Sequence, residues 1–404
     1  MLNELAAIIS FSFLGFLIGI ATGLIPGFHT NNVAITLLSL PFLNDLKAAI
    51  LISSAAITHT FLDIIPSTFI GAPEEDTALV ILPAHSMLLK GLGYKAISIS
   101  AKASMLSVIA SFMLLLPFKF FIGSPINFYI IIQKAMPFIL IAISVFVVAT
   151  SRNIKNAFLI FMLAGLFGIV ISHLPNSIFP ALAGLFGAST IIMAKKEELP
   201  EQKIDESDEN IEGLDIASGV LAGGVVAILP GVSSAIATTM ALEARKGSSE
   251  ENAIAILSAA NTATNFFVIA TLFILLKARS GFAIAMQHFL SISKWNNTPP
   301  QPLLIILASL LLSSILSFYA TKFIGKIIAK NISRINYSIL LILSLAIIIA
   351  MVTIFSGMIG LAIFIVATII GINCLKMNVR RSNLMGVLLI PLILFYIRLY
   401  IHLF

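Results

Sequence analysis

The feature of the sequence that most restricts its fold is a proline-glycine pair inside apolar sequence in each half of the chain. The first pair ends Gly-Leu-Ile-Pro-Gly at 23–27, and the second ends Ala-Ile-Leu-Pro-Gly at 227–231. The two motifs are 204 residues apart, almost half of the 404-residue chain. Without a gap, 14 of the 48 residues from 15 to 62 are identical to the residue 204 positions later, against roughly a tenth expected by chance. We interpret the chain as an internal duplication.

Composition places the chain in a membrane. Hydrophobic residues make up 59% and charged residues 10%, with a mean hydropathy of +1.07, whereas globular domains carry about 25% charged residues. The net charge of +6 does not indicate nucleic acid, because the basic residues stand at the ends of apolar segments. Cys374 is the single cysteine, which excludes an internal disulfide and argues against metal or redox chemistry. No basic region precedes the first apolar segment, so we expect it to stay in the mature protein, inserted in the plasma membrane.

Apolar runs long enough to cross a hydrocarbon core of about 30 Å recur in the same order in both halves. They lie near 96–120, 127–150, 155–172 and 177–194, then near 302–320, 337–354, 357–375 and 384–402. Three further apolar segments precede these four runs in each half, two that flank the Pro-Gly pair and one that follows them. They are 5–25, 28–43 and 47–63 in the first half and 214–229, 232–244 and 252–276 in the second. The sequence therefore predicts an all-α polytopic protein with about five spans in each half.

The basic residues of the short loops predict opposite orientations for the two halves. By the positive-inside rule, short loops with an excess of Lys and Arg are expected to be cytoplasmic. The basic residues of these loops are Arg152, Lys155, Lys195, Lys196, Lys322, Lys326, Lys330, Arg334, Lys376, Arg380 and Arg381. The span 127–150 then ends inside, whereas its counterpart 337–354 begins inside. We expect two inverted membrane repeats, 1–194 and 214–404, each with a re-entrant helical hairpin broken at Pro-Gly. Both termini are expected outside, and the acidic linker 195–213 in the cytoplasm as a flexible tether.

The helix breaks themselves predict a substrate site. Proline lacks an amide hydrogen and glycine favours non-helical backbone, so each break frees polar groups that lipid cannot satisfy. The N-terminus of the helix after a break attracts anions, and broken helices at matching points of inverted halves are typical of a transport site at the membrane midplane. Two proline-kinked helices with ordinary packing are the alternative. The candidate substrate-binding residues are Pro26, Gly27, His29, Thr30, Asn31, Asn32, Pro230, Gly231, Ser233 and Ser234.

A polar stripe in the next apolar run of each half suggests a second group of functional residues. These are Thr58, His59, Thr60 and Asp63 in the first half, and Asn261, Thr262, Thr264 and Asn265 in the second. Amide and hydroxyl oxygens can bind Na⁺, and His59 with Asp63, four residues apart, can carry a proton. Hydrogen bonding between helices is the competing use of these side chains. The stripe is therefore a candidate coupling-ion site, for Na⁺ or H⁺, or a shell around the substrate.

Three consecutive acidic residues, Glu74, Glu75 and Asp76, follow Gly71-Ala72-Pro73. Acidic side chains in the first turn of a helix stabilise it through the helix dipole, which is the structural explanation. Gating or coupling to a cation is the functional one.

Several motifs together resemble a known family. The run Gly15–Phe42, the stretches Ile65–Gly71 and Lys90–Ser104, and the second Pro-Gly copy are similar to the large membrane subunit of the tripartite tricarboxylate transporters, the TctA-like permeases, and above all to archaeal members. The resemblance implies a secondary active carrier of organic anions driven by an ion gradient. It also implies two partners, a small membrane subunit and an extracytoplasmic binding protein.

Two other functions are less well supported. The sequence Leu229–Ser234 is similar to the Pro-Gly-Val-Ser motif of polyprenyl-phosphate transporters, but no Lys or Arg lies within the Pro-Gly regions to bind a phosphate. An intramembrane protease would need His-Glu-x-x-His, or aspartates paired across spans, and neither pattern is present. We therefore expect a carrier of an organic anion, with a lipid-phosphate translocase as the alternative, and not an enzyme.

Overall fold

A computed structural model describes residues 2–25, 46–71, 81–193, 200–204, 211–228, 241–242, 249–278, 280–334 and 337–403. Within these ranges every regular element is a helix, as the apolar runs predict. Nine of the described helices are long and apolar enough to cross a membrane. The chain is therefore a multi-pass α-helical membrane protein.

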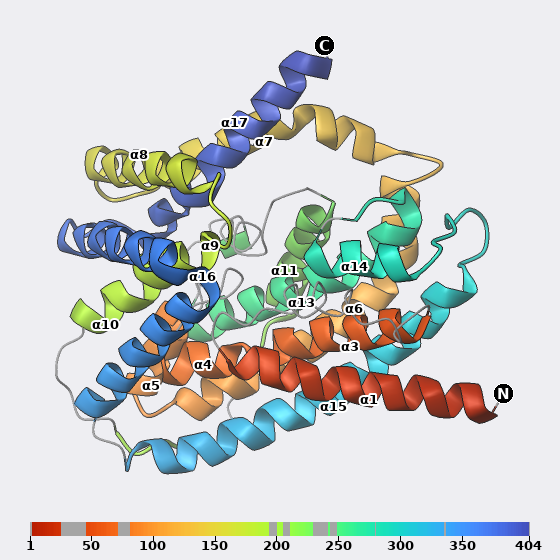
Figure 1. The fold of residues 1–404 in the computed structure, drawn as a ribbon, viewed down its shortest axis with the longest axis horizontal. Coiled ribbons are helices and arrows are strands. Elements are labelled where there is room, and N and C mark those ends of the chain that lie inside the picture. Colours follow the sequence, from red (N-terminus) through yellow and green to blue (C-terminus); the bar gives the residue numbers. More distant parts are fainter. Residues whose placement is uncertain are drawn as a thin grey trace.

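The first half contains ten helical elements with assigned bounds (Figure 1). They are α1 (Leu2–Leu24), α3 (Leu46–Leu62), α4 (Ile64–Phe69), α5 (Ile81–Leu89), α6 (Gly93–Ile122), α7 (Phe128–Ala149), α8 (Ile154–Ile171), α9 (Ile178–Leu182), the π-helical η1 (Ala183–Ala188) and α10 (Ser189–Met193). The second half contributes α11 (Gly213–Ala227), α13 (Glu250–Leu275), α14 (Gly281–Phe289), α15 (Gln301–Ile332), α16 (Tyr337–Lys376), the 3₁₀-helical η2 (Arg381–Met385) and α17 (Gly386–Leu403).

The two halves interlock instead of forming separate lobes. α3 packs against α15 of the second half, and α13 packs against α6 of the first. The same exchange occurs further along the chain, where α8 packs against α17, and α16 against η1 and α9. In Figure 1, α7, α8 and α17 lie together on the side away from α1 and α15.

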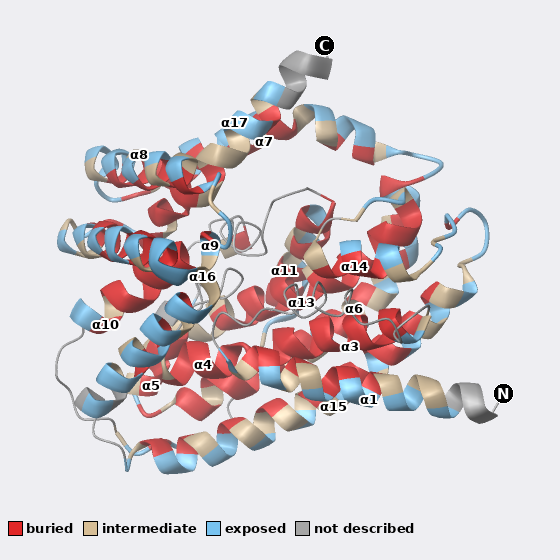
Figure 2. Cartoon of the chain, in the orientation of Figure 1, coloured by how far each residue is buried: buried red, intermediate tan, exposed pale blue. Residues whose placement is uncertain are grey.

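α3 and α13 form the buried centre of the molecule (Figure 2). From Ala48 to Leu62 every residue of α3 is buried, and so is almost every residue of α13 from Ile254 to Ile274. The surrounding helices expose large apolar side chains instead, among them Met113 on α6, Phe138 on α7 and Met358 on α16. Such side chains match a lipid environment, so the polar residues of α3 and α13 are the ones shielded from lipid by protein.

Glycines bring α1 onto α3 and α11 onto α13 in the same way. A Cβ at Gly19 would lie 2.4 Å from Thr58 Cβ and 2.8 Å from the Ala55 carbonyl oxygen. A Cβ at Gly223 would lie 2.8 Å from Ala263 Cβ and 2.6 Å from the carbonyl oxygen of Ala260. Only a residue without a side chain permits these approaches, so each glycine fixes a close helix contact.

These contacts correct the gapless register of the two halves. Gly19 and Gly223 are 204 residues apart, but their neighbours Thr58 and Ala263 are 205 residues apart. α13 is therefore shifted by one residue, about 100° of helix rotation, relative to its counterpart. The shift places the small Ala263 against α11, and Thr262, the sequence partner of Thr58, contacts α3 instead.

Two other expectations are refined. The predicted spans 337–354 and 357–375 form the single element α16, broken at Gly357, whose φ of 60° and ψ of −157° are not helical.

The linker is not a simple flexible tether along its whole length. Gln202 is buried, its Oε1 accepts a hydrogen bond of 2.9 Å from the Gly93 amide, and its Nε2 donates 3.1 Å to the Leu88 carbonyl. A glutamine that satisfies the backbone at a helix start holds this part of the linker against the α5–α6 turn.

Candidate functional site

Polar side chains join α3 and α13 where these two helices cross at the centre. Thr60 Oγ1 and Thr262 Oγ1 share a hydrogen bond of 3.2 Å, and Asn265 Nδ2 donates 3.3 Å to the carbonyl oxygen of Ala56. Further along α3, Asn261 Nδ2 donates 2.7 Å to Asp63 Oδ2. Residues later in the first-half segment contact residues earlier in α13, so α3 and α13 run antiparallel.

Asp63 occupies the junction between α3 and α4. Its backbone amide bonds to the His59 carbonyl oxygen at 3.0 Å, and its own carbonyl accepts the Ser67 hydroxyl at 2.9 Å. The residue is only 3% exposed. Burying a carboxylate is costly unless it is hydrogen-bonded, and the Asn261 amide supplies one such bond. A carboxylate retained at this depth is a functional-site candidate in a membrane protein.

His59 contacts α1. Its Nδ1 lies 3.2 Å from Thr22 Oγ1, and the Thr22 hydroxyl donates 3.2 Å to the Gly19 carbonyl. Because that hydroxyl has one hydrogen, the arrangement favours a His59 tautomer with the proton on Nδ1. His59 thus links α3 to the last turns of α1, close to the first Pro-Gly motif in sequence.

Serine and threonine stripes on two further helices complete the polar interior, and the sequence argument missed them. Ser317 Oγ on α15 donates 2.9 Å to Thr58 Oγ1, and Thr321 Oγ1 donates 3.1 Å to the Phe61 carbonyl. On α6, Ser107 Oγ donates 2.8 Å to the Ala259 carbonyl, and Ser100 Oγ accepts 2.8 Å from Ser258. The signal was present as small hydroxyl residues at helical spacing in apolar sequence, at 100, 104, 107 and 111 and at 313, 317 and 321.

The structure brings together most, though not all, of the predicted coupling residues that it describes. Asp63 and Thr60 meet Asn261 and Thr262, whereas Thr264 is only half-buried and donates to the Ala260 carbonyl of its own helix. The predicted substrate-binding and gating residues lie outside the described part of the chain. These are Pro26, Gly27, His29, Thr30, Asn31, Asn32, Glu74, Glu75, Asp76, Pro230, Gly231, Ser233 and Ser234.

The polar centre contacts α1 and α11 at glycines that precede the two Pro-Gly motifs in the sequence. A Cβ at Gly23, three residues before Pro26, would lie 3.3 Å from the Asp63 amide nitrogen and 3.0 Å from the His59 carbonyl oxygen. In the second half, a Cβ at Gly223 would lie 2.9 Å from the Thr264 amide nitrogen. The described ends of α1 and α11 thus pack against the polar residues of α3 and α13.

His85 on α5 contacts the end of α4. Its Nδ1 is 3.1 Å from the Thr68 carbonyl oxygen, and a Cβ at Gly71 would lie 3.9 Å from the same nitrogen. Burial lowers the pKa of His85 below 6.5; the hydrogen bond to the Thr68 carbonyl opposes this in part, and the charge of Arg381 adds a smaller lowering effect. Burial thus favours the neutral form of the imidazole.

The oxygen atoms that line the site determine which ions it suits. One carboxylate, two carboxamides and several hydroxyls form an oxygen-rich, weakly charged interior that suits a proton or a small hard cation such as Na⁺. Among the described residues no three His, Cys, Asp or Glu side chains gather as they would around a transition metal.

Comparison with known proteins gives two matches. The model of the family described as "Tripartite tricarboxylate transporter TctA family" matches residues 9–386. Over 398 residues the chain is 29% identical to "Uncharacterized protein MJ1079" of Methanocaldococcus jannaschii, an alignment that covers 95% of this chain and 98% of that protein. No solved structure matches the chain significantly.

Proposed function

Since the chain belongs to the TctA family of tripartite tricarboxylate transporters, we propose that it is a secondary active carrier of an organic anion of the carboxylate class. The observation that supports this most is the buried Asp63–Asn261 contact at the crossing of α3 and α13. A purely structural bundle has no need for a carboxylate at its centre, because apolar packing avoids the desolvation cost.

Helix directions support inverted-topology repeats. α3 and α13 run antiparallel, whereas α6 runs parallel to α13, since Ser100 meets Ser258 and Phe112 meets Phe266. α15 in turn runs parallel to α3, as its contacts with Thr58 and Phe61 require. If these helices cross the membrane, α3 and α6 of the first half each have a counterpart of opposite direction in the second half, α13 and α15. Such repeats exchange roles when access to a shared midplane site alternates.

The substrate site is proposed at the two Pro-Gly breaks, with the residues predicted from the sequence. Helix N-termini after the breaks would bind the carboxylate groups of the substrate through backbone amides, without a fixed positive charge. Asp63 lies close to the end of α1 and is proposed to carry the coupling ion, H⁺ or Na⁺, with Asn261 and the threonines as neutral ligands. A cation at Asp63 would lower the cost of bringing an anion nearby, which couples the two bindings.

The partners proposed are those of tripartite systems, a small membrane subunit and an extracytoplasmic binding protein. The test uses purified protein in proteoliposomes and uptake of radiolabelled di- and tricarboxylates under an imposed Na⁺ or H⁺ gradient. We expect gradient-dependent uptake that Gly27→Leu and Gly231→Leu each abolish while the protein remains folded. Normal uptake in both variants would exclude the Pro-Gly site, and lipid-phosphate exchange insensitive to carboxylates would favour the polyprenyl-phosphate alternative.

Asp63→Asn separates coupling from binding, because it keeps the shape of the side chain and removes its charge. We expect gradient-driven accumulation to fall at least tenfold, while exchange of internal for external substrate is retained. Thr271→Ala is the control on the same helix, since Thr271 is buried and its hydroxyl donates to the Val268 carbonyl of its own helix.

A further inference from the structure

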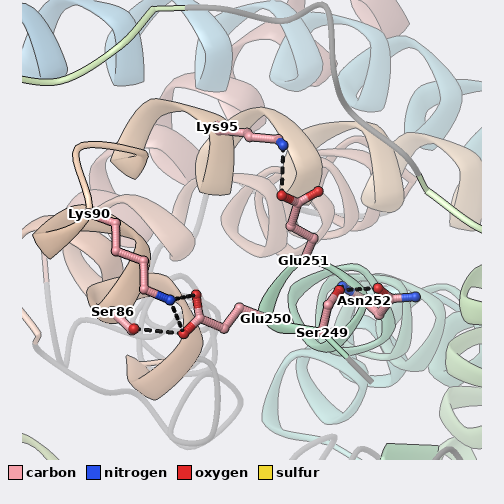
Figure 3. A network of polar contacts seen from close by, with 7 residues as sticks. All are labelled: Ser86, Lys90, Lys95, Ser249, Glu250, Glu251 and Asn252. Carbon is pink, nitrogen blue, oxygen red and sulfur yellow. Dashed lines mark hydrogen bonds and ion pairs between the residues drawn. The ribbon is translucent and has the colours of Figure 1, made fainter. Parts of the chain in front are cut away.

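Two ion pairs join the two halves of the chain at one end of the central helix pair (Figure 3). Lys90 Nζ donates 2.8 Å to Oε1 and 2.7 Å to Oε2 of Glu250, and Ser86 Oγ donates 2.7 Å to Oε1 of the same carboxylate. Next to this pair, Lys95 Nζ lies 2.6 Å from Glu251 Oε1. The lysines and the serine belong to α5, α6 and the turn between them, and both glutamates open α13.

These glutamates are not needed to cap α13. Ser249 already accepts the Asn252 amide at 3.2 Å as the N-cap residue. Asn252 Nδ2 in turn donates 2.7 Å to Asp215 on α11, within the second half. The dipole of α13 favours acidic residues in this turn, yet both carboxylates extend across to the first half and bind its lysines.

The α5–α6 turn is also held from its other side. Lys203 of the linker donates its backbone amide to the Gly91 carbonyl at 2.8 Å, beside the Gln202 contacts. The turn between Lys90 and Lys95 is therefore fixed to the linker and to α13 at once. This is the end of the molecule where α3 ends and α13 begins.

The opposite end of the central pair has a different charge arrangement. In the register of the helix contacts, where each residue of α13 corresponds to the residue of α3 that is 205 positions earlier, Glu251 corresponds to the uncharged Leu46 and Lys47 corresponds to Asn252. Lys47 lies 6.0 Å from the Phe11 ring centroid on α1, and among the described residues no ion pair joins the halves at this end. Within the described part of the chain, the ion pairs between the halves therefore lie at one end of the central helix pair.

We propose that the Lys90–Glu250 and Lys95–Glu251 pairs form a latch that keeps the linker-side end closed and biases the resting carrier toward access from the opposite end. The inference rests on the proposed transport function, because alternating access requires the halves to separate at one end at a time. The side chains are 56% and 35% exposed in the first pair and 16% and 27% in the second. Such pairs are weak enough to open during a cycle, since two exposed pairs shift an equilibrium by about 2- to 30-fold.

The test follows opening through thiol labelling. In a Cys374→Ser background, Ser258→Cys places a single thiol in the buried α6–α13 contact, two turns below Glu251. We expect Glu250→Gln with Glu251→Gln to raise the labelling rate by a membrane-impermeant maleimide about threefold or more. The charge-reversed pair Lys95→Glu with Glu251→Lys, at intact Glu250, should label at the original rate. Glu201→Gln, which removes a linker carboxylate at the same end, is the control.

A second reporter tests direction. Ser309→Cys on α15 is buried near the other end of the bundle, and its labelling should fall or stay constant when the pairs are removed. An unchanged Ser258→Cys rate in the double glutamine variant, or equal increases at both reporters, would overturn the latch. Uptake measured on the same preparations separates the two proposals. A labelling response without anion uptake under any gradient contradicts the transport function, whereas uptake with an unresponsive Ser258→Cys contradicts the latch alone.

Discussion

Asn261 Nδ2 donates a hydrogen bond of 2.7 Å to Asp63 Oδ2, and the two residues come from equivalent helices of the two halves. Both side chains are at least 96% buried. The bond therefore ties the halves together at a deeply buried polar position. The two residues it joins are 198 positions apart in the sequence.

Removing the donor should destabilise the protein. In Asn261→Ala the Asp63 carboxylate loses a charge-assisted hydrogen bond in a buried site, which costs about 1–3 kcal/mol of the free energy of unfolding. Thermal unfolding in detergent, followed by intrinsic fluorescence or a thiol-reactive dye at Cys374, measures the change. Asn331→Ala is the control, because the exposed Asn331 Nδ2 donates only to Ile327 of its own helix. Equal losses in both variants would contradict the role of the central bond.

How much of this site the sequence could predict differs between its parts. Polar residues at helical spacing in apolar runs indicated Thr60, Asp63, Asn261 and Thr262, because burying a polar group in a membrane requires a partner. Which residue each one meets could not be predicted. The one-residue shift of α13 depends on how close Gly223 lets α11 approach, and that distance is a tertiary property.

The fold, too, has features that the sequence predicts and features that it does not. Spans such as 127–150 and 155–172 and the break near Gly357 follow from hydropathy and from glycine's backbone freedom. The expected spans 302–320 and 177–194 were wrong in extent or form, because the first is part of the longer α15 and the second forms the short elements α9, η1 and α10. The sequence does not predict that α3 packs against α15, or that α13 packs against α6, because every span is apolar enough to pack against any other. The serines of α6 and α15 recur at helical spacing in the sequence, but only the packing of the helices shows which residue each of them contacts.

Adjacent glycines on α11 offer a matched test of the close helix contact. A Cβ at Gly223 would lie 2.6 Å from the Ala260 carbonyl oxygen, which is backbone and cannot turn aside. A Cβ at Gly224 would meet the Phe267 ring at 3.4 Å, an ordinary van der Waals distance. We expect Gly223→Ala to lose about 1–3 kcal/mol of stability through overpacking, and Gly224→Ala to change it little or raise it through helix propensity. The reverse order in thermal unfolding would show that α11 does not pack on α13 in this register.

The break in α16 tests backbone strain without steric crowding. Gly357 has a φ of +60°, and no atom lies within 4 Å of a Cβ placed there. Gly357→Ala should therefore cost about 1–3 kcal/mol purely because an L-residue disfavours this conformation. Gly213→Ala, at the start of α11 with equally open space and no positive φ, is the control and should be neutral or stabilising. Two neutral variants would mean that α16 is not broken at this residue.

His85 gives the protein a pH dependence whose sign can be worked out. Burial holds its pKa below 6.5 in the folded protein, whereas in the unfolded chain the pKa is close to the ordinary value. Below about pH 6.5 the unfolded chain therefore binds a proton more readily than the folded protein does. The stability contributed by neutral His85 is fully present above that pH, and it is lost as the pH falls toward the lowered pKa. A single group accounts for at most about 1.4 kcal/mol per pH unit.

We expect the thermal midpoint of the wild type to fall between pH 7.5 and pH 5, and that of His85→Gln to fall less, because glutamine can bond to the Thr68 carbonyl and does not titrate. His288→Gln on α14 changes an exposed histidine and should leave the wild-type profile intact. The midpoints are read by differential scanning fluorimetry in detergent at constant ionic strength, so that the latch at Glu250 and Glu251 is screened equally throughout. Parallel profiles for the wild type and His85→Gln would mean that protonation of His85 does not oppose folding, and hence that its ring is solvated rather than buried against Thr68.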